Sequence, residues 1–130
     1  MRLLLDTHIA VWIVTNDPRL SQRARELLAE ATGGVYVSVV SLWEIATKFA
    51  LGRPGDPMPF SAEEALRWFD DSGFGSLSVE PRHAVAVDHL PPHHRDPFDR
   101  ILIAQAISEP MRLLTRDARL PQYSPLVERV

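Results

Sequence analysis

The sequence predicts an α/β protein whose mainly parallel sheet is covered by helices on both faces. Short runs of apolar and β-branched residues recur at residues 3–5, 35–40, 77–79 and 111–115, and helical patterns separate them. Strands that alternate with helices favour parallel pairing and burial of both sheet faces. The length of 130 residues suits one domain, and we see no linker or internal repeat that would divide residues 1–130.

Composition excludes several classes of protein. Apolar residues make up 45% of the chain, which indicates a globular fold rather than disorder. No apolar run approaches the roughly 20 residues of a membrane span, and Asp6 interrupts the apolar start too early for a signal peptide. The lack of cysteine excludes disulfide scaffolds and fits a cytoplasmic location. A net charge of −3 argues against a general basic surface for nucleic acid, although arginines gather in the last third.

The expected elements follow one another closely. In chain order they are a strand at 3–5, helices at 8–14 and 22–31, a strand at 35–40, helices at 41–51 and 61–71, a strand at 77–79, helices at 81–87 and 97–108, and strands at 111–115 and 126–127. Ser41 with Glu44, and Ser61 with Glu64, have the spacing of capping boxes and place two helix starts. The segment 53–60 holds three prolines and a glycine, so we expect a loop there that acts as a lid or contacts a partner.

The helix expected at 97–108 begins with two acids. Asp96 has the chemistry of an N-cap, and Pro97 fits the first helical position, where its missing N–H costs nothing. Asp99 then lies at the third helical position, beside the positive end of the helix dipole. The helix is apolar almost all round and is therefore expected to be buried. Both acids could serve only to start the helix, or Asp99 could reach into a site.

Three further acids follow strands or open the helices after them. Asp6 comes after the first strand, Glu44 lies at the start of the helix after the second, and Asp117 follows the strand that ends at Thr115. Sites in parallel sheets form beyond the carboxyl ends of the strands. Each acid also has a local alternative, since Asp6 could cap a helix, Glu44 could pair with Ser41, and Asp117 could start a turn. Together, carboxylates without a balancing lysine would repel one another, and a divalent cation would resolve the repulsion. Oxygen ligands favour Mg²⁺ or Mn²⁺ over zinc.

Four segments resemble the motifs of a known family. They are residues 3–8 (LLLDTH), 38–45 (SVVSLWEI), 94–106 (HRDPFDRILIAQA) and 114–117 (LTRD). In order and spacing they resemble the four motifs of PIN-domain ribonucleases, in particular the VapC-type toxins of bacterial and archaeal toxin–antitoxin pairs. The resemblance spans nearly the whole chain.

The resemblance implies a metal-dependent endoribonuclease with a three-layer α/β/α fold and a mostly parallel sheet of four to five strands. The implied metal-binding and catalytic acids are Asp6, Glu44, Asp99 and Asp117, with Asp96 as the alternative to Asp99. Residues implied at the rim of the site or in RNA binding are Thr7, Thr115, Arg100 and Arg116. One or two Mg²⁺ ions, or Mn²⁺, would activate the water that attacks the phosphodiester. The implied partners are an RNA substrate, a small cognate antitoxin and a second copy in a homodimer.

Other functions compete with this one. A catalytically silent PIN-like module could bind RNA or protein without cleaving. A phosphatase with Asp6 as nucleophile would need a second Asp two residues later, where this chain has His8. The five histidines lack the spacing of a helical metal motif, and we expect His94 to contact RNA or support its loop. The three tryptophans, Trp12, Trp43 and Trp68, are expected in the core or at an interface.

Overall fold

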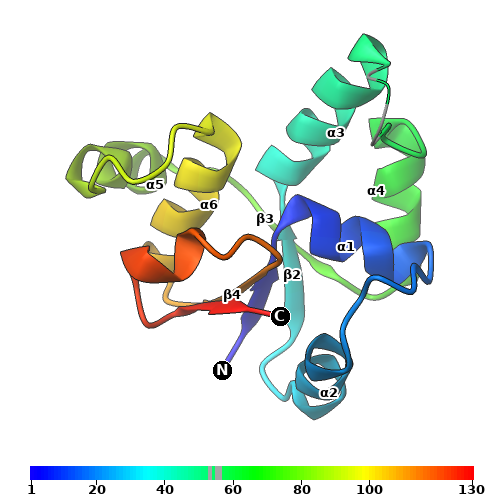
Figure 1. The fold of residues 1–130 in the computed structure, drawn as a ribbon, viewed down its shortest axis with the longest axis horizontal. Helices are drawn as coiled ribbons and strands as arrows, with labels where there is room; N and C mark the ends of the chain where they lie inside the picture. The colour runs from blue at the N-terminus through cyan, green and yellow to red at the C-terminus, as the bar shows by residue number, and fades with distance from the viewer. Residues whose placement is uncertain (53, 55–56) are drawn as a thin grey trace.

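A parallel five-stranded sheet runs through the centre of the computed structural model, which describes residues 1–52, 54 and 57–130 (Figure 1). In sheet order the strands are β3 (Gly75–Leu77), β2 (Val35–Ser38), β1 (Leu3–Leu5), β4 (Arg112–Thr115) and β5 (Val127–Arg129). All four pairings are parallel. The predicted parallel sheet is confirmed, at the upper end of the expected four to five strands.

Helices cover both faces of this sheet. They are α1 (Thr7–Val14), α2 (Gln22–Glu30), α3 (Val39–Leu51), α4 (Ala62–Asp71), α5 (Pro81–Ala86) and α6 (Pro97–Ser108), with 3-10 turns at Val87–His89 and Leu120–Tyr123. Figure 1 shows α5 and α6 on one side of the sheet and α1 and α4 on the other. The predicted three-layer α/β/α architecture is therefore confirmed.

The central strand β1 explains why the sheet needs two helical layers. Leu3 and Leu5 point into the core that contains α1, α2 and α4, whereas Leu4 points into the core against α6. This alternation follows from the two-residue repeat of a strand. All three side chains are buried, so the run of leucines at the start of the chain belongs to a strand with two apolar faces.

The start of α3 differs from the prediction. The strand β2 ends at Ser38, and the Ser38 hydroxyl caps α3 by accepting from the Val40 N–H at 3.1 Å. The predicted capping box of Ser41 and Glu44 is wrong, because both residues are buried inside the helix. The β-branched pair at 39–40 favoured a longer strand, but these residues form the first turn of the helix, and Val40 packs into the core against α6.

Other boundaries agree more closely. The capping box of Ser61 and Glu64 is confirmed, and Gly52 ends α3 with a φ of 55°, in the left-handed region that favours glycine. The strand β3 lies two residues earlier than predicted, where Gly75 and Leu77 pair with β2. Of the loop predicted at 53–60, residues 53, 55 and 56 lie outside the described part of the chain. Within the described part, no helix combines the length and apolar character needed to cross a membrane.

Replacing Ser38 with Ala will test the relocated helix start. The variant loses one cap hydrogen bond, so we expect its free energy of unfolding to fall by about 1 kcal/mol. Thermal melts followed by circular dichroism measure the change. Ser76→Ala, an exposed serine on the neighbouring strand, is the control and should stay within about 0.5 kcal/mol of the wild type. An unchanged Ser38→Ala variant would contradict the assigned cap.

Candidate active site

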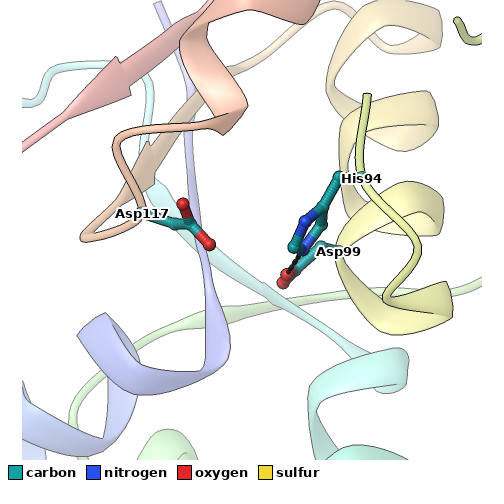
Figure 2. Close-up of side chains that lie close together, drawn as sticks. All are labelled: His94, Asp99 and Asp117. Atoms are coloured by element: carbon teal, nitrogen blue, oxygen red, sulfur yellow. Dashed lines mark hydrogen bonds and ion pairs between the residues drawn. The ribbon is translucent and has the colours of Figure 1, made fainter. Parts of the chain in front are cut away.

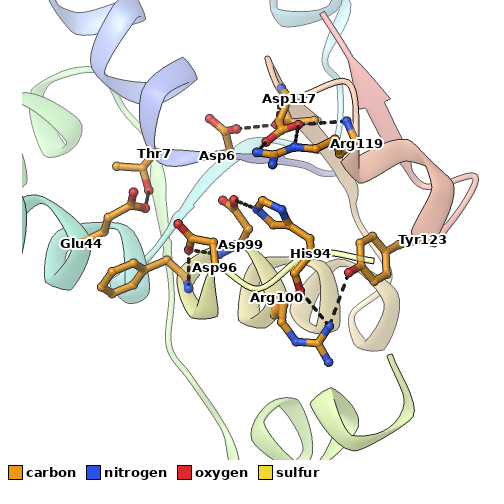
Figure 3. Close-up of polar contacts among 12 residues, drawn as sticks. Asp6, Thr7, Glu44, His94, Asp96, Asp99, Arg100, Asp117, Arg119 and Tyr123 are labelled. Atoms are coloured by element: carbon orange, nitrogen blue, oxygen red, sulfur yellow. Dashed lines mark hydrogen bonds and ion pairs between the residues drawn. The ribbon is translucent and has the colours of Figure 1, made fainter. Parts of the chain in front are cut away.

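The carboxyl ends of β1 and β4 meet the N-terminus of α6 and one side of α3 at a single cavity of about 190 Å³. Figure 3 shows the acids of these elements facing one another. The cavity is lined by Asp6, His8, Glu44, Lys48, His94, Asp96, Asp99, Arg116, Asp117 and Arg119. The structure therefore brings together all four predicted acids and the alternative Asp96.

Asp6 is buried at the junction of β1 and α1. Its Oδ1 caps α1 by accepting from the Ile9 N–H at 3.0 Å, and its Oδ2 accepts from the Thr115 hydroxyl at 2.5 Å. Burial raises the pKa of Asp6, and these two hydrogen bonds oppose that shift. The predicted capping role is thus confirmed, and the same side chain also lines the cavity. Thr115 belongs to the site by holding this carboxylate.

Glu44 comes from the second turn of α3 and is buried. The Thr7 hydroxyl donates to Glu44 Oε1 at 2.6 Å and lies 2.9 Å from Ser41 Oγ. Glu44 Oε2 forms an ion pair with the ammonium of Lys48, one turn further along the helix. The expectation that the acids lack a balancing lysine is therefore wrong.

The two acids at the start of α6 divide their tasks. Asp96 Oδ1 accepts from the N–H groups of Phe98 and Asp99, at 2.9 and 3.1 Å, which confirms Asp96 as the N-cap. Asp99 instead reaches into the cavity, where its Oδ2 lies 2.7 Å from His94 Nε2. Burial raises the pKa of Asp99 to about 6, and the neighbouring Asp96 carboxylate adds to the shift, while the hydrogen bond with His94 opposes it.

Asp117 occupies the turn after β4. Its N–H donates to the Thr115 hydroxyl oxygen at 3.1 Å, so Thr115 connects two acids of the cavity. The Arg119 guanidinium donates to both carboxylate oxygens, at 3.0 and 2.7 Å, and lowers the pKa of Asp117 to about 2. Asp117 is therefore ionised throughout the physiological pH range.

Three side chains in this cavity could hold one metal ion. Figure 2 shows Asp99 and His94 in contact and Asp117 across from them. One potential ligand atom from each of the three lies within 4.8 Å of the others. Two carboxylates and an imidazole, with Asp6 nearby, form an oxygen-rich donor set that fits a hard divalent cation. Burial is the main cause of the raised pKa of Asp99, and the nearby carboxylates, first among them Asp96, add negative charge that such an ion would offset.

Sequence reasoning left four residues of the cavity out of the predicted site and misplaced one other; the four are His8, Lys48, His94 and Arg119. His94 was expected at RNA or in its loop, whereas it contacts Asp99; no helical spacing could reveal this contact, because His94 lies in the loop before α6. Lys48 could have been found from its position four residues after Glu44. Arg100 does not line the cavity: its guanidinium donates to the Pro91 carbonyl at 3.0 Å and lies near other carbonyls of the loop. Its predicted place at the site rim is therefore wrong.

Arg116 does lie at the cavity, as predicted for the rim. Its guanidinium carbon is 5.2 Å from the centroid of the Trp12 ring. The guanidinium carbon of Arg19 lies 4.8 Å from the same centroid. Both distances suit a cation–π contact. Trp12 is buried, which confirms its predicted core position.

The family model for the PIN domain matches residues 3–125 of this chain. The chain belongs to the PIN-domain family. Among PIN relatives, ribonuclease VapC22 of Mycobacterium tuberculosis is 30% identical over 124 residues, which cover 93% of this chain and 91% of that protein. The resemblance found in the sequence motifs is confirmed.

Solved structures agree with the PIN fold. The VapBC2 complex of Rickettsia felis, bound to a DNA fragment from its promoter, contains a chain that matches with a TM-score of 0.70 and 18% identity, covering 100% of this chain and 99% of that one. A chain of the DNA-bound VapBC of Salmonella typhimurium matches with a TM-score of 0.68 and 18% identity, over 99% of this chain and 98% of the other. At this identity the likeness shows the shared fold.

Proposed function

We propose that this PIN protein is a metal-dependent endoribonuclease and the toxin of a type II toxin–antitoxin pair. The observation that carries the proposal is the convergence of Asp6, Asp99 and Asp117, from three separate elements, on one cavity. The relative from Mycobacterium tuberculosis, which covers nearly the whole chain, is named a ribonuclease. The cytoplasm, where RNA is abundant, is the proposed place of action.

The ion that suits this donor set best is Mg²⁺, with Mn²⁺ as the alternative. Asp6, Asp99 and Asp117 would hold it, with His94 beside them. When bound, such an ion lowers the pKa of a water molecule and offsets the charge of a phosphodiester. The protein's own contribution is positional: Thr115 fixes Asp6, and the cap at Asp96 fixes the first turn that carries Asp99. Arg116 and Arg119, at the edge of the cavity, would bind flanking phosphates of the RNA.

Protein partners complete the proposal. Large apolar side chains are exposed over α3 and α4: Trp43, Phe49, Leu51, Leu66 and Trp68. Exposed apolar side chains on two neighbouring helices favour a protein interface there. The solved structures that share the fold are VapB–VapC complexes, and on this basis we propose a small antitoxin and a second copy of this chain as partners. Trp43 and Trp68 are exposed, so of the two predicted locations, core or interface, we propose the interface for both.

Metal removal tests the proposed reaction. The purified chain should cleave single-stranded RNA in Mg²⁺ or Mn²⁺ and stop when EDTA is added, because the clustered carboxylates cannot bind a phosphodiester without a cation. Gel analysis of an end-labelled RNA measures the cleavage. A chain that binds RNA without cleaving it under every divalent condition would be a silent binding module, and the nuclease proposal would fail.

A further inference from the structure

The ion pair between Glu44 and Lys48 separates Glu44 from the other acids of the cavity. We propose that Lys48 forms the binding subsite for the scissile phosphate of RNA, and that Glu44 positions this lysine instead of coordinating the metal. The proposal rests on the ribonuclease function proposed above and deepens it. It assigns a ligand class, a phosphodiester oxyanion, to the side of the cavity formed by α3.

Glu44 is held differently from Asp6. Asp6 accepts hydrogen bonds from two neutral donors, the Ile9 N–H and the Thr115 hydroxyl, and these leave its negative charge to attract a cation. Glu44 accepts from the neutral Thr7 hydroxyl on Oε1, but its Oε2 contacts the Lys48 ammonium. A divalent ion placed on Glu44 would therefore meet a positive charge already in contact with the same carboxylate.

The pair of Asp117 and Arg119 shows the contrast. Arg119 has 64% of its side chain exposed, so it can swing into solvent and release Asp117 to a metal. The Glu44 side chain is only 4% exposed and that of Lys48 is 28% exposed, and one helix carries both. This pair cannot open as easily as the surface pair, so Lys48 remains at the cavity when a metal binds to the aspartates.

Lys48 lies where a phosphate needs a cation. It lines the same cavity as Asp99 and Asp117. His8 and Arg116 line this cavity together with Lys48, so two cationic side chains border the space next to the acids. An ammonium has three donors, so Lys48 can keep Glu44 and still donate to a phosphate oxygen. The Glu44 carboxylate thus orients the Lys48 ammonium, and the ammonium binds a phosphate oxygen of the RNA.

A purely stabilising ion pair explains these contacts less well. A buried ion pair gives little net stability, since the desolvation of both charges offsets their attraction, and two apolar side chains of similar size would serve as well. The Thr7 hydroxyl adds a further hydrogen bond that fixes the Glu44 carboxylate from α1. Side chains from two helices, α1 and α3, thus fix the carboxylate that contacts this amine, and Lys48 is the only lysine in the sequence.

Metal affinity and RNA cleavage, measured on the same variants, test the two halves of the proposal. Mn²⁺ binding followed by electron paramagnetic resonance should change less than about threefold in Lys48→Met and in Glu44→Gln, whereas Asp99→Asn should lose the ion. The value of kcat/KM for RNA should fall about 100-fold in Lys48→Met and recover in part in Lys48→Arg, which restores the charge. The kcat/KM of Glu44→Gln should fall as much as that of Lys48→Met. The control is Arg25→Met, which changes an exposed arginine on α2, and its kcat/KM should equal that of the wild type.

The single lysine offers a direct readout that does not depend on catalysis. Reductive methylation with ¹³C places one lysine signal in the NMR spectrum, separate from that of the N-terminal amine. In the Asp99→Asn background, which leaves RNA intact, addition of a short RNA should shift the Lys48 signal, and the shift should weaken with salt. The absence of a shift would overturn the phosphate subsite.

The outcomes separate this proposal from the function on which it rests. If the wild type cleaves RNA and Lys48→Met cleaves equally well, the phosphate subsite is overturned and the ribonuclease function stands. If Glu44→Gln loses Mn²⁺ as completely as Asp99→Asn, Glu44 is a metal ligand and its positioning role is overturned. A wild-type chain that binds Mn²⁺ and cleaves no RNA overturns the ribonuclease function itself.

Discussion

Replacing Asp99 with Asn will lower RNA cleavage about 1,000-fold, whereas the same change at Asp96 will keep activity within about tenfold. Asp99 points into the cavity beside His94 and Asp117, where the loss of its charge removes a ligand of the proposed ion. Asp96 accepts two backbone hydrogen bonds as the N-cap of α6, and an asparagine oxygen can accept the same bonds. Single-turnover cleavage of a labelled RNA measures both variants.

The two substitutions control for each other, because they remove the same charge three residues apart in one helical turn. Equal thermal melting of the two variants in the absence of metal would indicate equal folding and strengthen the comparison. If Asp96→Asn were inactive and Asp99→Asn active, the ligand at the start of α6 would be Asp96, and the division of tasks drawn from the hydrogen bonds would be wrong.

The part of the stability that Asp99 contributes to the metal-free protein will fall as the pH rises from about 4 to 7, and a divalent cation will reverse the trend. The folded protein raises the pKa of Asp99 from 3.8 to about 6, so Asp99 binds its proton more tightly in the folded state. That contribution to the free energy of unfolding is fully present below pH 3.8 and is lost as the pH passes about 6. The pKa of Asp6 is raised as well and acts in the same direction.

A bound cation needs these carboxylates ionised, so its effect is largest at neutral pH. At 100 times its dissociation constant, Mn²⁺ should stabilise the wild type by about 2.7 kcal/mol at pH 7 and by less at pH 5. Asp99→Asn should melt about 3 °C higher than the wild type without metal and gain little from Mn²⁺. Thermal melts at pH 5 and 7, with EDTA or Mn²⁺, measure all four conditions. A metal-free wild type and a metal-free Asp99→Asn variant with the same change in stability between pH 5 and 7 would contradict the raised pKa of Asp99.

The choice of substitution at Asp6 matters for the same experiment. Asp6→Ala would remove the cap of α1 and leave the Thr115 hydroxyl without its acceptor, so repulsion is not the only interaction that changes. Asp6→Asn removes the charge and keeps an acceptor for the Ile9 N–H, and its amide N–H can donate to the Thr115 oxygen where Oδ2 accepts in the wild type. It is the better variant for measuring how much the carboxylates of the cavity repel one another.

The parts of the fold that depend on interactions between residues close in the chain could be predicted from the sequence. The cap of α6 at Asp96 and the capping box at Ser61 use side chains that bond to backbone within three residues, so spacing alone reveals them. The buried strand β1 could be predicted because an uninterrupted apolar run needs two covered faces. The start of α3 could not, because the spacing of Ser41 and Glu44 imitates a capping box while the fold uses Ser38.

The site also has a part that the sequence could predict and a part that it could not. Asp6, Glu44 and Asp117 could be placed from the order of strands and helices, which brings their backbone positions to one edge of the sheet, whereas Asp99 joined them only through the family resemblance. The directions of longer side chains could not be placed so. Arg100 turns back to the loop before α6, and His94 in that loop turns toward Asp99, since each finds its hydrogen-bond partner only after the loop has folded.

The contact of Thr115 with Asp6 has a consequence for how activity arises during folding. It joins residues 109 positions apart and exists only when β1 and β4 lie side by side in the centre of the sheet. Closing such a long stretch of chain has an entropic cost, which the pairing of the two strands must offset. Asp6 is therefore held in the cavity only once β1 and β4 have paired, so the proposed site forms together with the centre of the sheet and not before it.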